Sequence, residues 1–290
     1  MTSPIAHFNG ELLPLDEIRV SPLDRGFIFG DGVYEVIPAY GGRLLRARGD
    51  LNPPPRAMGE IRPPHPPPPH RGVPEGKPPP AHHPGNQAVY IQVTRGVPPK
   101  RDHVIPKGLS PTVFMMATPL STPSPEMVEK GVACVTAKDF RWEKCHIKST
   151  SLLGNVLARQ VSADAGATET ILFRDGFLTE AAASNVFVVK GGRVAAAPQD
   201  NHILLGITYE LLTELAREGK VDFAIRPIPE AEVRAADEIW LSSSTKEVLA
   251  VTTLDGKPVG AGVPGPLFRR MHALFQEYKS RLAAAAAVAD

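Results

Sequence analysis

Short apolar runs predict β-strands in both halves of the chain. The predicted strands cover residues 33–40, 88–94, 113–117, 170–174, 185–190, 193–197 and 238–241. Asn9-Gly10 supplies the positive φ values that a tight hairpin turn requires. Pro38 lies inside the first predicted strand and cannot donate to a sheet ladder, so we expect it at a sheet edge or a bulge.

Apolar residues at helical spacing predict two helices in the second half. The first has an apolar face and stops near Gly166. That face comprises Leu152, Leu153, Val156, Leu157 and Val161. We expect this helix to begin at Lys148. The second helix covers residues 207–217 and ends at Gly219, and the alanine-rich segment after Arg281 is expected to continue a surface helix.

Strand and helix signals mix without a regular alternation, which favours an α+β fold in two domains. We expect a small N-terminal α/β domain over residues 1–120 and a larger domain over residues 126–290. The Ser-, Thr- and Pro-rich stretch at residues 121–125 is the expected linker.

Bulk composition limits the classes of partner. The 32 basic and 31 acidic residues give a net charge of +1, so nothing favours nucleic acid or an anionic membrane. The first residues lack a signal-peptide pattern, and no apolar run reaches membrane-span length. We therefore expect a cytoplasmic protein. Cys134 and Cys145 have no metal-like spacing, and reduced thiols are favoured over a disulfide between them.

Residues 53–84 contain 14 of the 31 prolines of the chain. Each proline in a helix interior costs about 3 kcal/mol, so this window cannot be helical as written. One interpretation is a disordered polyproline linker. The other is a corrupted segment, in the gene or in the reading of it, because many codons become proline codons through one base change.

Lys148 and Glu180 are the main candidates for chemistry. A lone lysine is usually a surface residue, but at a helix start the positive end of the dipole favours the neutral amine. Glu180 leads into the apolar run 186–189, and a carboxylate that enters the interior needs a cationic partner. An amine that can lose its proton and a buried carboxylate suit pyridoxal phosphate, which requires a Schiff-base lysine and an acid at its ring nitrogen.

Anion-binding groups are the second set of candidates. Gly206-Ile207-Thr208 precedes a helix, where N–H groups can hold a phosphate, although an ordinary helix cap has the same appearance. The hydroxyl cluster 242–245 is either a polar turn or a set of donors for the same anion.

Carboxylate-binding groups form the third set. Arg101 and His103 lie two residues apart and form either a solvated loop or a carboxylate clamp. Tyr34 and Glu35 point to opposite faces of a strand, and the phenol is the better candidate for contact with a substrate.

The motifs that carry these residues belong together. They are Asp24-Arg25-Gly26, Phe29-Gly30-Asp31-Gly32-Val33-Tyr34-Glu35-Val36, Gln92-Val93-Thr94-Arg95-Gly96, Ile147-Lys148-Ser149, Leu152-Leu153-Gly154, Thr179-Glu180, Ser184-Asn185-Val186-Phe187, Ile203-Leu204 and Gly206-Ile207-Thr208. As a set, over nearly the whole chain, they resemble the class IV (fold-type IV) pyridoxal phosphate aminotransferases, and most of all their D-amino-acid branch. The resemblance implies a small N-terminal domain and a larger, β-barrel-like C-terminal domain with helices.

The resemblance also implies roles for individual residues. Lys148 is the Schiff-base lysine and proton shuttle, and Glu180 pairs with the pyridine nitrogen. The other implied cofactor contacts are Leu204, Ile207, Thr208, Ser244 and Thr245. Tyr34, Arg101 and His103 form a trap for the substrate α-carboxylate, with Arg101 and His103 reaching in from the partner subunit of a homodimer. The implied reaction moves the amino group of a D-amino acid to a 2-oxo acid such as 2-oxoglutarate, with no metal.

Several departures keep alternatives open. The family's phosphate-binding arginine falls on Pro53, and Ala181-Ala182-Ala183 replaces a more hydroxyl-rich stretch. An L-branched-chain aminotransferase or an aminodeoxychorismate lyase of the same fold is an alternative function. A non-enzymatic relative, impaired by the proline-rich window, is an alternative from a different class.

Overall fold

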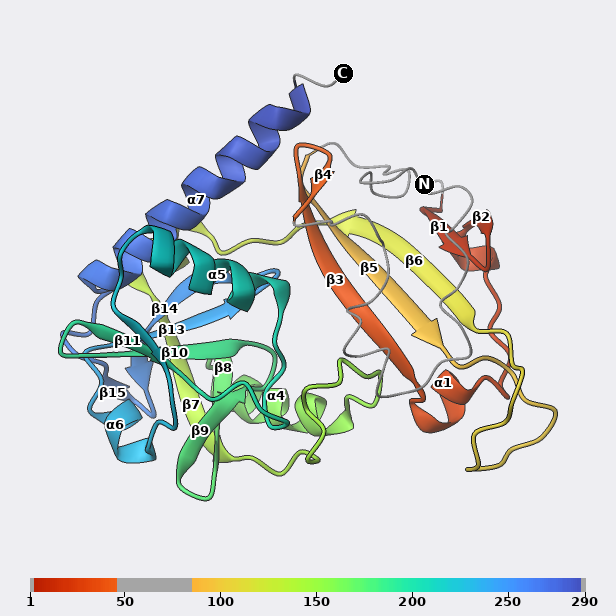
Figure 1. Ribbon diagram of the computed structural model, residues 1–290, viewed down its shortest axis with the longest axis horizontal. Coiled ribbons are helices and arrows are strands. Elements are labelled where there is room, and N and C mark those ends of the chain that lie inside the picture. The colour runs from red at the N-terminus through yellow and green to blue at the C-terminus, as the bar shows by residue number, and fades with distance from the viewer. Residues whose placement is uncertain (1–2, 46–84, 288–290) are drawn as a thin grey trace. The chain divides into compact units, whose positions relative to one another are not determined.

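The computed structural model describes residues 3–45 and 85–287 (Figure 1). The chain divides into two compact units. Unit 1 comprises residues 1–121, 147–152 and 281–290, and unit 2 comprises residues 122–146 and 153–280. The proline-rich window 53–84, with Pro53, lies outside the described residues, so both interpretations of it stay open. The domain limits expected from the sequence stay a prediction.

Unit 1 contains a six-stranded antiparallel sheet in the order β2-β1-β6-β5-β3-β4. Its elements are β1 (Ile5–Phe8), β2 (Glu11–Pro14), the 3-10 helix η1 (Leu15–Glu17), α1 (Arg25–Phe29), β3 (Gly32–Tyr40), β4 (Arg43–Leu44), β5 (Gln87–Thr94) and β6 (Thr112–Pro119). The strands predicted at 33–40, 88–94 and 113–117 are confirmed by β3, β5 and β6. Alternate residues such as Val33, Ile91 and Met115 pack into one apolar cluster on one face of the sheet.

The expected Asn9-Gly10 turn of unit 1 is confirmed, but the expectation that Pro38 lies at a sheet edge or a bulge is wrong, because β3 lies between β5 and β4 and its pairing with β5 is regular. Asn9 and Gly10 have φ values of 50° and 101° and join β1 to β2. Pro38 pairs with Ala88 of β5 without a register shift. The Pro38 carbonyl accepts a hydrogen bond from Leu45 N (2.7 Å), so its peptide edge faces away from β5. The nitrogen of Pro38 therefore also faces away from β5, where the pairing with β5 requires no N–H donor, and the strand tolerates the proline.

The segment that carries Lys148 is extended, so the expectation of a helix start at this residue is wrong. Ser149 forms an antiparallel bridge with Val33 of β3. The hydroxyls of Thr150 and Ser151 donate to the Gly30 carbonyl at 2.9 and 3.0 Å. These side chains therefore bind a neighbouring backbone instead of capping a helix. The predicted helix exists, as α4 (Leu153–Asp164), and begins five residues later.

Unit 2 contains a nine-stranded mixed sheet in the order β12-β11-β10-β13-β14-β7-β8-β9, with β15 paired to β14. Its strands are β7 (Val132–Lys138), β8 (Glu169–Arg174), β9 (Phe177–Ala181), β10 (Asn185–Lys190), β11 (Arg193–Ala196), β12 (Phe223–Ile225), β13 (Glu238–Ser243), β14 (Glu247–Leu254) and β15 (Lys257–Pro258). The sheet curls, so that β9 at one end of this order also contacts β10, and the Ala181 N–H donates to the Ser184 carbonyl in the turn between them. The α+β fold class and all four strands predicted in this half are confirmed.

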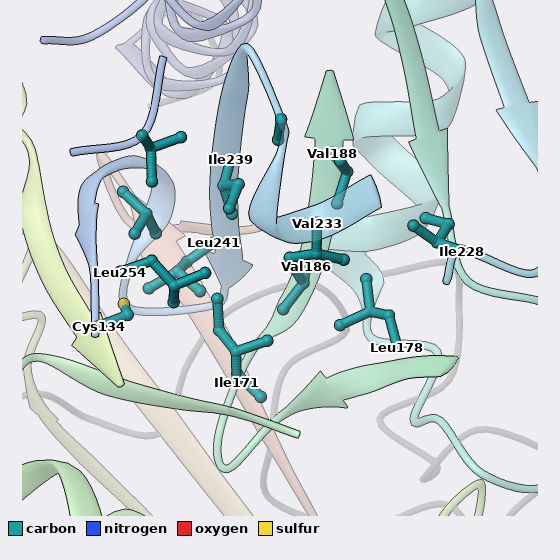
Figure 2. Close-up of a cluster of buried hydrophobic side chains, with 14 of the residues drawn as sticks. Cys134, Ile171, Leu178, Val186, Val188, Ile228, Val233, Ile239, Leu241 and Leu254 are labelled. Atoms are coloured by element: carbon teal, nitrogen blue, oxygen red, sulfur yellow. The ribbon is translucent and has the colours of Figure 1, made fainter. Parts of the chain in front are cut away.

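A large apolar cluster lies in the interior of unit 2. Branched side chains from several strands, among them Ile171, Val188, Ile239 and Leu241, meet there (Figure 2). Burial of such side chains stabilises a fold by about 1.5–3 kcal/mol each relative to exposure. The strand ends around this core are therefore held rigidly. Cys134 and Cys145 are buried thiols, so the alternative of a disulfide between them is wrong.

The helices are α3 (Pro125–Lys130), α4, α5 (Ile207–Glu218), α6 (Glu230–Arg234) and α7 (Pro266–Ala287). The second predicted helix is confirmed by α5, which ends at Gly219. The apolar face predicted for α4 is confirmed, but it is exposed rather than packed: Leu153 is 70% and Val156 58% exposed. None of these helices is long and apolar enough to cross a membrane, within the residues that the structure describes.

Candidate active site

Lys148 is fixed along the edge of β3. Its carbonyl accepts a hydrogen bond from Tyr34 N (2.9 Å), which places the lysine beside Tyr34, the expected substrate contact, and its neighbour Glu35. Its Nζ lies 3.7 Å from Glu35 Oε1 and 4.6 Å from the centre of the Tyr34 ring. Tyr34 and Glu35 point to opposite faces of β3. Because Lys148 lies along the edge of that strand, its side chain can contact both of these residues. The amine is thus held between a buried carboxylate and an aromatic face.

The Tyr34 ring belongs to an aromatic row that crosses the sheet of unit 1. Its centre lies 5.7 Å from that of Tyr90 on β5, which in turn lies 6.3 Å from Phe114 on β6. Tyr90 donates a hydrogen bond to Gln92 (2.7 Å). Burial, with a smaller contribution from Tyr34, raises the pKa of Tyr90 to about 12, so this phenol stays protonated. The row provides a rigid, uncharged wall behind Tyr34.

Arg101 and His103 lie on an exposed loop between β5 and β6 of unit 1. Both side chains contact the ring of Phe29: the Arg101 guanidinium carbon lies 5.0 Å from its centre, and the His103 ring centre 5.1 Å. The structure therefore brings the two proposed carboxylate ligands together on one aromatic surface.

Glu180 on β9 is buried, as expected, and its cationic partner in the chain is Arg141 (Nη1–Oε1 2.5 Å). Arg141 also binds Asp139 through two contacts, Nε–Oδ1 at 3.0 Å and Nη2–Oδ2 at 2.9 Å. Thr179 donates to Asp139 (2.9 Å), and Arg174 lies 3.4 Å from the same carboxylate. Sequence reasoning assigned no role to Arg141 or Asp139.

The second carboxylate oxygen of Glu180 is also bound. It accepts hydrogen bonds from Asn185 Nδ2 (3.2 Å) and from Leu204 N (3.1 Å). Complete burial raises the pKa of Glu180 to about 7, although Arg141 and the Leu204 N–H both lower it. A carboxylate has about four acceptor positions, and three are used by these partners, so one acceptor position remains.

Asn185 links Glu180 to the predicted phosphate-binding elements of unit 2. Its Nδ2 also donates to the Leu204 carbonyl (2.8 Å), and Gly206 begins α5 close to its Oδ1. Its backbone pairs with Ser242 at the end of β13. Glu180, Leu204 and the ends of α5 and β13 are therefore collected around one amide side chain that the sequence did not single out.

The start of α5 has the properties of an anion site. Gly206 is its N-cap and offers no side-chain bond, and the N–H groups of a first helical turn have no partner within the helix. Thr208 is buried, and its hydroxyl has no hydrogen-bond partner among the residues that the structure describes. Ser243 accepts from Lys246 N (3.0 Å), which bends the chain so that Ser244 and Thr245 follow β13 in a tight turn.

The family model described as Amino-transferase class IV matches residues 79–254. The chain belongs to the class IV aminotransferases. This class IV aminotransferase is 36% identical over 280 residues to a D-alanine aminotransferase of Bacillus licheniformis, with 93% of the chain and 95% of that protein covered. It is 34% identical over 284 residues to a D-alanine aminotransferase of Staphylococcus epidermidis, with 93% and 96% covered.

A solved structure shows the same fold. The branched-chain aminotransferase of the thermophilic archaeon Thermoproteus uzoniensis, determined with norvaline, matches with a TM-score of 0.80 and 20% identity over 96% of this chain and 95% of that one. At this identity the likeness shows the fold alone. The protein is thus an aminotransferase of fold-type IV, which confirms the resemblance and does not favour a non-enzymatic relative.

Class IV aminotransferases depend on pyridoxal phosphate, and the residues of unit 2 fit that group. The start of α5 and the buried hydroxyl of Thr208 suit a phosphate. Glu180 retains one acceptor position for a ring N–H, and its burial suits an apolar ring. No cluster of three or more acidic, His or Cys side chains in the described segments could hold a metal ion.

The buried pair between Arg141 and Glu180 generates a stability prediction. The Arg141 side chain is 3% exposed, and Arg141→Met leaves the carboxylates of Glu180 and Asp139 buried without their nearest cation. Removing one partner of a buried pair costs about 3–5 kcal/mol, so we expect a loss of that size in the free energy of unfolding of unit 2. Both tryptophans of the chain, Trp142 and Trp240, lie in unit 2, so their fluorescence in urea measures it.

The matched control is Arg193→Met. Arg193 pairs with Asp222 at 2.8 Å, but its side chain is 60% exposed. An exposed pair contributes about 0–1 kcal/mol, so this variant should unfold close to the wild type. Equal losses in the two variants would show that the Arg141 pair does not stabilise the unit.

Proposed function

We propose that this aminotransferase transfers the amino group of D-amino acids to a 2-oxo acid such as 2-oxoglutarate. The observation that carries the proposal is the likeness to D-alanine aminotransferases at 34–36% identity over 93% of the chain. The Arg101 and His103 side chains support it further, since both contact the ring of Phe29 and both are groups that can bind a substrate carboxylate.

The proposed cofactor is pyridoxal phosphate, which when bound supplies an aldehyde for a lysine amine and a ring that withdraws electrons from the substrate. Ile207 and Thr208 would hold its phosphate through the first N–H groups of α5. Ser244 and Thr245 would add hydroxyl donors, and Leu204 would pack against the ring. Glu180 would accept a hydrogen bond from the ring nitrogen, with Arg141 and Asn185 fixing the orientation of its carboxylate.

Lys148 is the proposed catalytic residue. Its Nζ would form the covalent link to the cofactor and then hold and move the substrate proton. Glu35, 3.7 Å away, orients the amine, and the Tyr34 ring limits its other directions of movement. The expected reason for lysine reactivity, a helix dipole, does not apply, because Lys148 precedes α4 by five residues.

Tyr34, Arg101 and His103 are the proposed trap for the α-carboxylate, with the Arg101 loop acting in a partner subunit. Two exposed apolar surfaces support a homodimer. One is the face of α4, where Leu153 and Val156 are among the exposed residues. The other is the tip of the Arg101 loop, where Val104 is 74% exposed. Exposed apolar surfaces of this kind mark interfaces. A cytoplasmic location is also proposed, and the two free cysteines agree with it.

The configuration of the amino acids that the enzyme accepts as amino donors tests the proposed function. Paired D and L enantiomers of several amino acids, each with 2-oxoglutarate, should give transamination with the D forms and little with the L forms. Formation of L-glutamate or D-glutamate and of the donor's 2-oxo acid measures the reaction. A preference for L-leucine or L-valine would favour an L-branched-chain enzyme. Pyruvate release from aminodeoxychorismate would favour the lyase.

Removal of the reactive amine is the second test. Lys148→Ala should abolish turnover, with kcat reduced by at least about 10³-fold, because covalent catalysis and proton transfer are lost together. Lys130→Ala is the control, because Lys130 is exposed and pairs with Glu126 in the adjacent helical turn. Borohydride reduction and peptide mapping should place the cofactor on residue 148. A label on another lysine of the active enzyme would contradict the assignment.

Mixing two inactive variants tests whether Arg101 acts in a partner subunit. If it does, a heterodimer of Lys148→Ala and Arg101→Ala chains contains one site with both residues intact. Random exchange of subunits in a twofold dimer then restores about a quarter of the wild-type activity. If Arg101 acts within its own chain, both sites of the heterodimer stay impaired and no activity returns.

A further inference from the structure

The loop that carries Arg101 and His103 is held by an arginine from a distant part of unit 1. Arg25, at the start of α1, is buried, and its guanidinium lies against three successive backbone carbonyls of the loop. Nη1 donates to the carbonyl of Asp102 at 2.6 Å and to that of Val104 at 3.4 Å, and Nη2 donates to that of His103 at 3.3 Å. Only the planar fork of a guanidinium offers several donors in such an arrangement.

Arg25 is itself fixed by a buried ion pair. Its Nε donates to Asp31 Oδ2 at 2.7 Å, and Arg95 Nε donates to the same oxygen at 2.7 Å. Burial opposes the charge of Asp31, but the hydrogen bonds from Arg95 and Arg25 outweigh it and lower its pKa. The Arg25 backbone N–H also binds the Gly96 carbonyl (3.0 Å), where β5 leads into the loop. These contacts fix the orientation of the Arg25 guanidinium, and its hydrogen bonds to the loop carbonyls in turn fix the loop backbone.

Phe29 supports the two side chains from the other end of α1. Its ring lies against the Arg25 guanidinium (4.9 Å) as well as against the Arg101 guanidinium and the His103 imidazole. A guanidinium within about 6 Å of an aromatic face is attracted to it. One ring thus restrains both proposed carboxylate ligands, while Arg25 restrains the backbone between and after them.

We propose that Arg25, Asp31 and Phe29 are positioning residues that set the geometry of the Arg101 and His103 pair and so determine the affinity for substrate carboxylates. This inference rests on the proposed function, because it assumes that the pair binds the α-carboxylate. None of the three is proposed to touch substrate. Their effect is to order the ligands before binding, which removes an entropic cost from each binding event.

Phe29→Leu tests the aromatic support. Phe29 is half-buried, so a smaller apolar residue should be accommodated. We expect the KM for the D-amino donor and the inhibition constant of propionate, a simple carboxylate, to rise about tenfold, with kcat changed less than the KM. Phe29→Tyr keeps the ring and should restore values close to the wild type. Cofactor absorbance should be unchanged in both variants.

Arg25→Met tests the backbone support, and Arg193→Met is its control. Arg25→Met should raise the same two constants by at least about tenfold, because charge-assisted hydrogen bonds to the loop are lost. Amide hydrogen exchange in residues 98–108 should also become faster, whereas Arg193→Met should change neither measurement. If Arg25→Met does not fold, the KM and the propionate inhibition constant of Phe29→Leu still test the positioning role.

The outcomes separate this inference from the proposed function. A wild-type enzyme without activity on D-amino donors would overturn the proposed function. An active wild type whose Phe29→Leu variant keeps its KM and its propionate constant would overturn only the positioning role. A loss of thermal stability without a change in propionate binding would likewise reduce these residues to a structural role.

Discussion

A charge removed from water must be neutralised by its neighbours, and this constraint shapes both units. In unit 1 one carboxylate, Asp31, lies between Arg25 and Arg95. In unit 2 one guanidinium, Arg141, lies between Asp139 and Glu180. Each arrangement joins segments far apart in sequence, and each is expensive to break at its centre, because loss of the central charge leaves two charges of the same sign close together and shielded from water.

The two networks, each within its own unit, order different kinds of group for the proposed chemistry. The network in unit 1 ends at backbone carbonyls of the loop that carries Arg101 and His103, so it orders the proposed carboxylate ligands. The network in unit 2 ends in Glu180, so it orders an acid whose remaining acceptor position suits a ring nitrogen. The proposed reaction needs ligands that hold the substrate carboxylate and an acid that keeps the cofactor ring electron-poor, so it needs the groups that both networks order. The charged networks therefore give a common physical basis to the proposed roles.

Much of this arrangement could be predicted from the sequence. The apolar runs located β3, β5, β6, β8 and β10, because the inward-facing side chains of a strand must be apolar whatever their partner. The identity of Glu180 as a buried acid followed from its small and apolar neighbours. Helix α5 was equally clear, because its spacing and terminal glycine agree.

Other features depend on contacts that no local pattern contains. Lys148 was placed at the start of the helix whose apolar face follows it, but the hydroxyls of Thr150 and Ser151 bind Gly30, more than a hundred residues earlier. Arg141 follows a strand as an ordinary loop residue, and nothing nearby reveals its pairing with Glu180. The apolar face of α4 was visible, but not that it is exposed, because a periodic pattern shows which side is apolar and not what covers it.

The path of the chain adds a consequence for biosynthesis. Residues 147–152 belong to unit 1, whereas the segments on both sides of them belong to unit 2. Ser149 pairs with Val33, so the edge of β3 is completed by residues that leave the ribosome after the rest of its sheet. Contacts between such distant residues form slowly. The proposed reactive amine of Lys148 is thus secured only after the six strands of its own sheet have been synthesised, and a nascent chain interrupted before residue 148 would carry those strands without it.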